Sequence, residues 1–437
     1  MEVIIFMRRT TFFVLFVLCF VIVIVSFGCL SLRTNDKIEA SVALNSVSYE
    51  ITTAYNKKTL DNEFINRLNN AQAKMYELFS EEEKENYCVS PISIYMALSL
   101  LDFVGDEKVK EDISSLLGLS EEDILMTKEL FDFLVRENRV FTGKGEERKV
   151  VGLLDMTNSI WVDNDITPEE ETLNALAEKF YCYAYKTPFS SDIVKANKDI
   201  RVFIKDKTRG LIDKDFDLDS DTIFALINTL YFKDNWNDEG NDLLVENKEF
   251  YTKDGKITCE YLLAPYIGGQ VYSDELSESF YTETTSKFRI VFVMPKDNVS
   301  IKEVMNGNHI NIINSKIFNT DGDVATRLIF PRFKVECETK VKDILEKKGY
   351  LSQTFACFKS NLIEDPLFVS DIKHNVSLNV DKKGIEGAAV TIIAMDKNSG
   401  PLFAKEYQDF IINKEFGFYV MIDNVILFMG QITNPLK

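Results

Sequence analysis

The chain has 437 residues, 46% of them hydrophobic, and a formal net charge of −19 at pH 7. This length and composition allow a large buried core, whereas so negative a charge repels phosphate backbones and argues against nucleic-acid binding. The seven cysteines include no C-x-x-C pair. That spacing excludes a dense disulfide framework and favours scattered, mostly buried thiols.

The N-terminus carries a targeting pattern. Arg8 and Arg9 precede an apolar run at residues 12–27. A positive flank followed by an apolar run of this length is typical of a secretion signal or a signal anchor. The positive flank stays inside, so we expect the rest of the chain to lie outside the cytoplasm, secreted or anchored at the cell surface.

The residues after the apolar run leave the fate of this segment open. Gly28 and Cys29 resemble the lipidation site of bacterial lipoproteins, although Ser26 stands where Leu is usual. Three hypotheses therefore remain for residues 1–29: a cleaved signal peptide, a lipoprotein signal with a lipidated Cys29, or an uncleaved membrane anchor. Residues 30–62 are polar and mixed, which predicts a tether.

Helical patterns dominate the first half of the chain. From Phe64, apolar residues recur at helical spacing and predict an amphipathic helix; they are Ile65, Leu68, Ala71, Met75, Leu78 and Phe79. Ser90 suits the N-cap and Pro91 the first turn of a second helix. Further helical patterns lie at residues 108–118, 121–137, 168–180, 196–206 and 340–347.

Strand-like runs dominate after residue 150. They lie at residues 159–162, 223–232, 289–294, 326–334, 376–380, 416–422 and 425–430. Several of them, including IFALINTLYF at 223–232, are apolar on both faces, as expected for a covered central sheet. This distribution predicts an α+β architecture in one large domain.

The sequence gives little support for an enzyme. The only two histidines are His309 and His374, which excludes an H-E-x-x-H zinc site, and there is no P-loop, G-x-S-x-G or G-x-G-x-x-G motif. Abundant carboxylates leave a paired-carboxylate site open. A histidine among apolar strand residues, such as His374, is usually a hydrogen-bonded core residue. We therefore expect no enzymatic activity, no metal and no cofactor.

Five segments, in the right order and spacing, resemble the serpin family of protease inhibitors over about residues 63–437. They are NYCVSPISIYMALSLL (86–101), NTLYFKDNW (228–236), FPRFKVECETKVKDILEKKGY (330–350), FVSDIKHNVSLNVDKKGIEGAA (368–389) and FGFYVMIDNVILFMGQITNP (416–435). The resemblance implies the serpin fold, with a central mostly β sheet, additional sheets and about nine helices. It also implies an exposed reactive-centre loop at about 384–412.

The resemblance implies suicide inhibition. A protease attacks the loop and forms an acyl-enzyme; the cut loop then inserts as a new central strand and deforms the attached protease. The partner would be a serine protease or, alternatively, a cysteine protease, met by a monomer without a cofactor. The family's shutter, a hydrogen-bonded cluster that holds the central strands, would comprise Ser90, Ser93, Asn228 and His374. Trp236 would mark the breach, where the loop first enters.

The hinge meets the demands of insertion. Alternate side chains of a new strand face the core, where an unpaired charge costs several kcal/mol. Counting from Gly384, the inward positions are uncharged and are Ile385, Gly387, Ala389 and Thr391. Glu386, Ala388 and Val390 alternate with them, and the outward position of Glu386 allows its charge to stay in water.

Two hinge positions depart from the family pattern. Lys382 stands where Glu is usual, so we expect looser insertion or a different partner for this residue. Ile385 replaces Thr or Ser, but its branched apolar side chain suits a strand. Together with an unusually long loop, these departures favour the alternative function, a non-inhibitory serpin acting as a binding or structural protein.

The family's hinge-to-scissile spacing predicts the reactive bond at Asn398–Ser399. A register one residue shorter gives Lys397–Asn398, and Asp396 or Met395 would need a shorter inserted strand. Lys397 would suit a trypsin-like enzyme with an acidic specificity pocket. Asn398 is unusual for serine proteases and would suit an asparagine-specific cysteine protease.

Overall fold

The computed structural model describes residues 37–47, 60–81, 83, 85–136, 140–142, 149–236, 242–268, 271–317, 324–350, 358–364, 366–367, 372–386 and 406–437. Residues Ala40–Lys437 belong to one compact unit, so the unit begins earlier than the predicted boundary at residue 63. Among the described residues, no helix is long and apolar enough to cross a membrane. The apolar run at 12–27 and Cys29 lie outside them.

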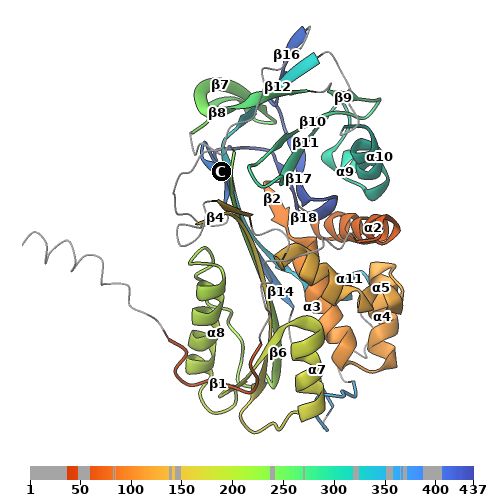
Figure 1. Ribbon diagram of the computed structural model, residues 1–437, viewed down its shortest axis with the longest axis vertical. Helices are drawn as coiled ribbons and strands as arrows, with labels where there is room; N and C mark the ends of the chain where they lie inside the picture. The colour runs from red at the N-terminus through yellow and green to blue at the C-terminus, as the bar shows by residue number, and fades with distance from the viewer. Residues whose placement is uncertain are drawn as a thin grey trace, which may run out of the picture. The chain divides into compact units, whose positions relative to one another are not determined.

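An eight-stranded sheet forms the centre of the unit (Figure 1). Its order is β1–β5–β4–β6–β15–β14–β13, with β3 paired to β4. The bounds are β1 Val42–Ala43, β3 Val140–Thr142, β4 Lys149–Asp163, β5 Cys182–Thr187, β6 Phe224–Asn235, β13 Phe333–Lys340, β14 Lys373–Val380 and β15 Gly384–Glu386. The doubly apolar run at 223–232 is therefore a central strand, β6, as predicted.

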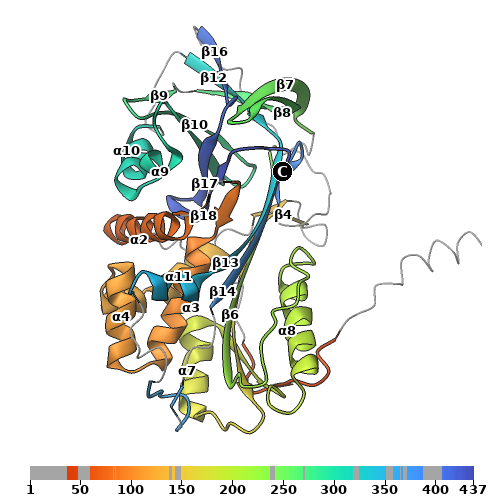
Figure 2. The same cartoon turned by 180° about the vertical axis from the view of Figure 1, so that it is seen from behind.

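Two smaller sheets complete the β structure. The six-stranded sheet contains β2 (Tyr87–Val89), β18 (Val425–Ile432), β17 (Phe416–Ile422), β11 (Arg289–Pro295), β10 (Ser277–Glu283) and β9 (Tyr272–Ser273). The four-stranded sheet contains β16 (Glu406–Ile411), β12 (Val324–Pro331), β8 (Gly255–Gly268) and β7 (Leu244–Thr252). The strands β16 and β12 lie at one end of the unit and β1 near the other (Figures 1 and 2).

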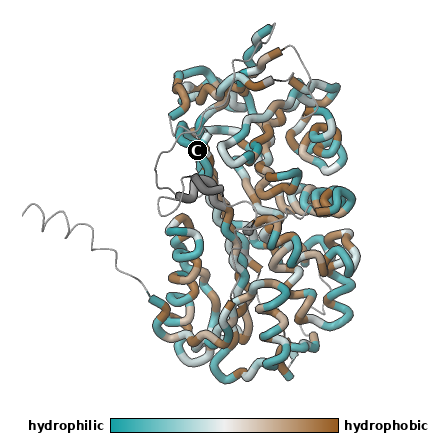
Figure 3. Tube along the Cα trace, in the orientation of Figure 1, coloured by the Kyte–Doolittle hydropathy of each residue, from teal (hydrophilic) through white to brown (hydrophobic). Residues whose placement is uncertain are grey.

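Ten α-helices occur in the described residues, where about nine were expected. They are α2 Asn62–Ser80, α3 Pro91–Val104, α4 Glu107–Leu117, α5 Glu121–Leu125, α6 Thr127–Phe131, α7 Glu170–Phe180, α8 Ile193–Lys207, α9 Ile301–Val304, α10 Gly307–Ile317 and α11 Val341–Lys347. The helix α8 covers one face of the large sheet, and α3 and α7 lie on the other (Figure 1). The helices α7 and α8 carry both polar and apolar residues, as amphipathic helices do, whereas α3 is buried on nearly all sides (Figure 3).

Two local predictions differ from the structure. The run at 326–334 is not one strand: it divides between β12 and β13, which belong to different sheets. Pro331 has no N–H to continue the first ladder. The pattern at 121–137 is two short helices and a π-helical turn, not one helix. Here the hydroxyl of Thr127 donates to the carbonyl of Ile124 at 2.5 Å and competes with the helical ladder.

The segment predicted as a polar tether, 30–62, contributes residues to two elements of the fold. Residues 42–43 form β1, an edge strand of the large sheet. The helix α2 begins at Asn62, where the side chain of Asp61 accepts from the backbone N–H of Phe64. The signal for β1 is weak in the sequence, because two paired residues are too few to show an alternating pattern.

Candidate functional site

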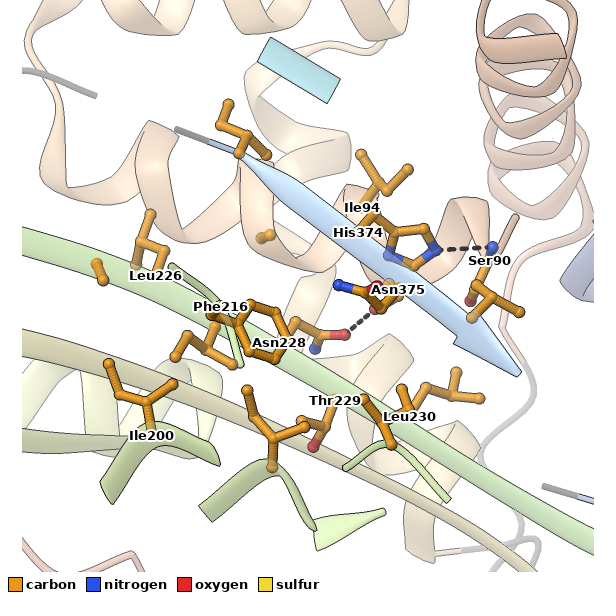
Figure 4. Close-up of a pocket in the computed structure, with 18 of the residues that line it drawn as sticks. Ser90, Ile94, Ile200, Phe216, Leu226, Asn228, Thr229, Leu230, His374 and Asn375 are labelled. Atoms are coloured by element: carbon orange, nitrogen blue, oxygen red, sulfur yellow. Dashed lines mark hydrogen bonds between the residues drawn. The ribbon is translucent and has the colours of Figure 1, made fainter. Parts of the chain in front are cut away.

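The site lies in the large sheet, between β6 and β14. Within the described residues, these two strands are joined only through β15, which pairs antiparallel with both. Beside β15, the facing edges of β6 and β14 border a cavity of about 120 Å³ (Figure 4). Its lining includes Asn228 from β6 and His374 from β14. The sheet is thus open where one further strand could lie.

A tight hairpin turn connects β14 to β15. The backbone N–H of Asp381 donates to the carbonyl of Gly384 at 3.0 Å. The carboxylate of Asp381 accepts from the N–H of Lys383 at 2.8 Å and of Gly384 at 3.3 Å. A side chain bonded to the backbone two residues on is an Asx turn. This turn sets the register in which Val380 faces Ile385.

Gly384 allows the hinge to approach β6 closely. A Cβ atom at this position would lie 2.0 Å from the carbonyl oxygen of Asp234. Asp234 itself departs from the family motif, and it is buried. Its carboxylate accepts from the N–H and hydroxyl of Ser286 at 2.8 and 3.0 Å, and burial raises its pKa to about 6. The breach therefore contains a carboxyl group bonded to neutral donors.

The next two hinge residues point to opposite faces. Ile385 is fully buried. Glu386 forms an ion pair with Lys233, with 3.2 Å between Oε1 and Nζ, and both side chains are about four-fifths buried. Burial raises the pKa of Glu386 and lowers that of Lys233, so desolvation outweighs their attraction. Glu386 is therefore only partly exposed to water, because its partner lies on the neighbouring strand.

The other predicted loop residues lie outside the described residues. They are the hinge positions Gly387, Ala388, Ala389, Val390 and Thr391 and the candidate reactive residues Lys397, Asn398 and Ser399.

The four shutter residues surround the cavity but form two separate groups. On one side, the hydroxyl of Ser93 donates to Asn228 Oδ1, and Asn228 Nδ2 donates to Asn158 Oδ1 on β4 at 2.7 Å. On the other, the N–H of Ser90 donates to His374 Nε2 at 3.0 Å (Figure 4). The two groups are joined through the backbone, where the N–H of Ser93 donates to the carbonyl of Ser90 at 3.1 Å. Among the described residues, no side-chain hydrogen bond links them.

Ser90 occupies the N-cap position of α3, but its hydroxyl does not cap the helix. The hydroxyl instead donates to the carbonyl of Leu427 on β18 at 2.8 Å. The predicted N-cap position is therefore confirmed, although the hydroxyl makes no capping hydrogen bond. Ser90 links α3 to both β14 and β18 through its two donors.

His374 should make the native form sensitive to acid. Burial lowers its pKa to about 4, compared with 6.5 for a free histidine. Its contribution to stability is therefore fully present above pH 6.5 and is lost as the pH falls towards 4, by about 3 kcal/mol. We expect the Tm of the wild type to approach that of a His374→Asn variant over this window.

The comparison with His374→Asn is needed because Asp234 acts in the opposite direction. Its raised pKa means that the native state gains stability from Asp234 as the pH falls through about 6. Asp234 is present in both proteins, so its effect cancels. If the Tm difference between the wild type and His374→Asn stays constant from pH 6.5 to 4.5, His374 does not have a lowered pKa in the native state.

The breach holds the turn before β15 through main-chain contacts. Trp236 Nε1 donates to the carbonyl of Asp381 at 2.6 Å, and its backbone N–H donates to Lys383 O at 3.2 Å. The sequence left two outcomes for Lys382, looser insertion or a different partner. The structure shows a partner, because Nζ of Lys382 lies 2.7 Å from the carboxylate of Asp242. This hydrogen bond raises the pKa of Lys382. Sequence reasoning missed Asp242, because it lies 140 residues earlier in an irregular segment.

The cysteines that the structure describes match the prediction of scattered, mostly buried thiols. Cys88, Cys182 and Cys259 are buried, and Cys337 is half-buried. No group of three or more His, Cys, Asp or Glu residues in the described part of the chain could hold a metal ion.

The sequence and the fold match known proteins over most of the chain. The family model "Serpin (serine protease inhibitor)" matches residues 66–435. The antitrypsin of Bombyx mori is 24% identical over 391 residues, which cover 86% of this chain and 95% of that protein.

Two solved structures show the same fold. Arabidopsis AtSerpin1 in its native stressed conformation has a TM-score of 0.71 at 19% identity, covering 87% of this chain and 100% of that one. Human thyroxine-binding globulin complexed with thyroxine has a TM-score of 0.67 at 19% identity, covering 85% and 99%. At these identities the likeness concerns the fold only.

Proposed function

The chain belongs to the serpin family, and we propose that it is a suicide inhibitor that traps a protease by inserting its cut reactive loop between β6 and β14. The observation that carries the proposal is the position of β15. These three residues already pair with both neighbouring strands, beyond one end of the cavity that β6 and β14 border. A strand that continues β15 would follow the same register into the open part of the sheet.

The chemistry of trapping follows from that geometry. The protease nucleophile adds to the carbonyl carbon of Asn398, or of Lys397 in the shorter register. The peptide C–N bond breaks, and the amine of the next residue leaves with a proton. An ester, or a thioester for a cysteine protease, joins the two proteins. Insertion moves the acyl group away before water hydrolyses it, so the bond persists.

The gap between β6 and β14, here called the slot, has buried faces that favour an inserted strand. Ile385 is already enclosed, and the cavity walls are largely apolar; they include Leu226, Leu230, Ile94 and Ile200 (Figure 4). A strand with uncharged inward residues would bury them there, and burial of apolar surface stabilises by about 25 cal/mol per Å². Insertion therefore releases free energy that can drive deformation of the attached protease.

We also propose that the protein acts outside the cytoplasm. The apolar run that follows Arg8 and Arg9 supports this location. A tether at the N-terminus would keep the inhibitor at the cell surface, where it would meet extracellular proteases.

The proposal is tested by mixing the protein with trypsin-like, elastase-like, subtilisin-like and asparagine-specific proteases. We expect a complex that survives SDS with at least one of them, and a released C-terminal fragment. A fragment that starts at Ser399 assigns the reactive residue as Asn398, and one that starts at Asn398 assigns it as Lys397. If every enzyme cuts the loop without a complex, the non-inhibitory alternative holds.

A further inference from the structure

The segment Ala40–Val47, here called the N-terminal strap, lies along the outer edge of the large sheet. Its β1 pairs antiparallel with β5, and the N–H of Leu44 donates to the carbonyl of Ala184 at 2.8 Å. The side chain of Asn45 extends the ladder, donating to Cys182 O at 3.0 Å and accepting from Ala184 N at 2.9 Å. The strap thus completes an edge that would otherwise expose unpaired backbone groups.

The strap is also bound to α8. The backbone N–H groups of Ala40 and Ser41 donate to one carboxylate oxygen of Asp199, at 2.9 and 2.6 Å. Asp199 lies on α8 and is 1% exposed. The hydroxyl of Ser41 bonds that of Thr187 on β5 at 2.7 Å. Because hydrogen bonds to a charged group are stronger than neutral ones, the strap ties α8 firmly to the sheet edge.

The helix α8 is one wall of the slot. Ile200, the residue after Asp199, and Ile204, one turn further on, line the cavity between β6 and β14. The chain that follows α8 extends this wall with Leu211, Ile212, Phe216 and Leu218. Asn197 fastens the two parts together, because its side chain both donates to and accepts from the backbone of Leu218, at 2.9 and 3.2 Å.

A strand that enters the slot must therefore displace this wall. The displacement strains the contact with Asp199, one residue from the cavity, or detaches β1 from β5. We propose that the N-terminal strap restrains α8 over the slot and so slows insertion of the uncut reactive loop. The inference rests on the proposed function, because the inserting strand is the reactive loop. It gives the segment before the inhibitory domain a role in the lifetime of the active state.

The test uses the full chain with two variants at the two ends of one contact. Ser41→Pro removes a backbone donor to Asp199, and Asp199→Asn keeps the side-chain shape but removes its charge. The matched control is Val194→Thr, a substitution at a residue of α8 that is 76% exposed. Each protein is held uncut at a constant temperature below its Tm. The fraction that becomes resistant to unfolding, and can no longer trap a protease, is followed in time.

We expect each variant to convert at least tenfold faster than the wild type, and the double variant to be no faster than the faster single one. The control should match the wild type. A variant that fails to fold is recognised by its Tm at time zero. In that case Ser41→Ala, which removes only the contact with Thr187, is measured in its place. We expect it to raise the conversion rate by a smaller factor. The inference is overturned if the variants convert at the wild-type rate or more slowly. It is also overturned if none of the proteins converts.

A second arm separates this inference from the proposed function. The wild type is cut in its reactive loop and heated. If cutting does not stabilise it, insertion itself fails and the proposed function fails with it. If cutting stabilises the protein but the variants convert like the wild type, only the role of the strap is wrong.

Discussion

Replacing Ile385 by Asp is expected to turn the proposed inhibitor into a substrate. In the uncut protein the side chain of Ile385 is already fully buried between β14 and β6, opposite Asp234. An unpaired carboxylate there costs several kcal/mol, so we expect β15 of the variant to leave the sheet and insertion to begin by burying this charge. Each 1.36 kcal/mol that this adds to the barrier for insertion slows it about tenfold. Hydrolysis of the acyl-enzyme then outruns insertion, and the protease is released. We expect the yield of SDS-resistant complex to fall at least about tenfold.

The measurement is the ratio of covalent complex to cut inhibitor after reaction with a protease that the wild type traps. Ile385→Val is the matched control, because it keeps an apolar branched side chain and typically costs about 0.5–1.5 kcal/mol. This variant should still trap the enzyme. If the Asp variant forms as much complex as the wild type, burial of position 385 in the sheet is not required for trapping.

The second large effect is on stability. Cutting the reactive loop with a protease that is not trapped should raise the Tm, by about 2 °C for each kcal/mol that insertion adds to the stability of a large domain. The physical reason is the open sheet. A continued β15 would gain hydrogen bonds to both β6 and β14 and fill the cavity beside them.

Calorimetry of the uncut and cut chains measures this difference. The cut Ile385→Asp protein is the control, and its Tm should rise less because one inward position opposes burial. An unchanged Tm in the cut wild type would mean that the loop stays outside the sheet.

The sequence predicts the central elements of this fold because their patterns are local. The stripe on α2 shows helical periodicity, and five of its six predicted residues are buried while Leu78 is half-buried. The central position of β6 follows from its two apolar faces. By contrast, the division between β12 and β13 depends on which sheet each half joins, a tertiary choice that a continuous apolar run does not show.

The site is predictable where the family resemblance supplies residues, and less so where contacts cross the fold. The resemblance leads to Trp236 and to the four shutter residues, and the structure places all of them in or around the open sheet. It does not indicate that the side-chain hydrogen bonds of the shutter residues fall into two groups. Nor does it identify Asp242 or Asp199, whose partners lie more than 100 residues away in the sequence. Charge complementarity alone cannot select such pairs among 69 acidic residues.

The most direct test of the central claim is amide hydrogen exchange in β6 and β14 before and after the loop is cut. The backbone groups of these strands that face the cavity should gain protection when the new strand pairs with them, because exchange requires the hydrogen bond to open. The β17–β18 pair, which belongs to another sheet, is the internal reference and should not change. If exchange in β6 and β14 stays the same while the loop is fully cut, the slot does not accept the loop, and this protein does not inhibit by insertion.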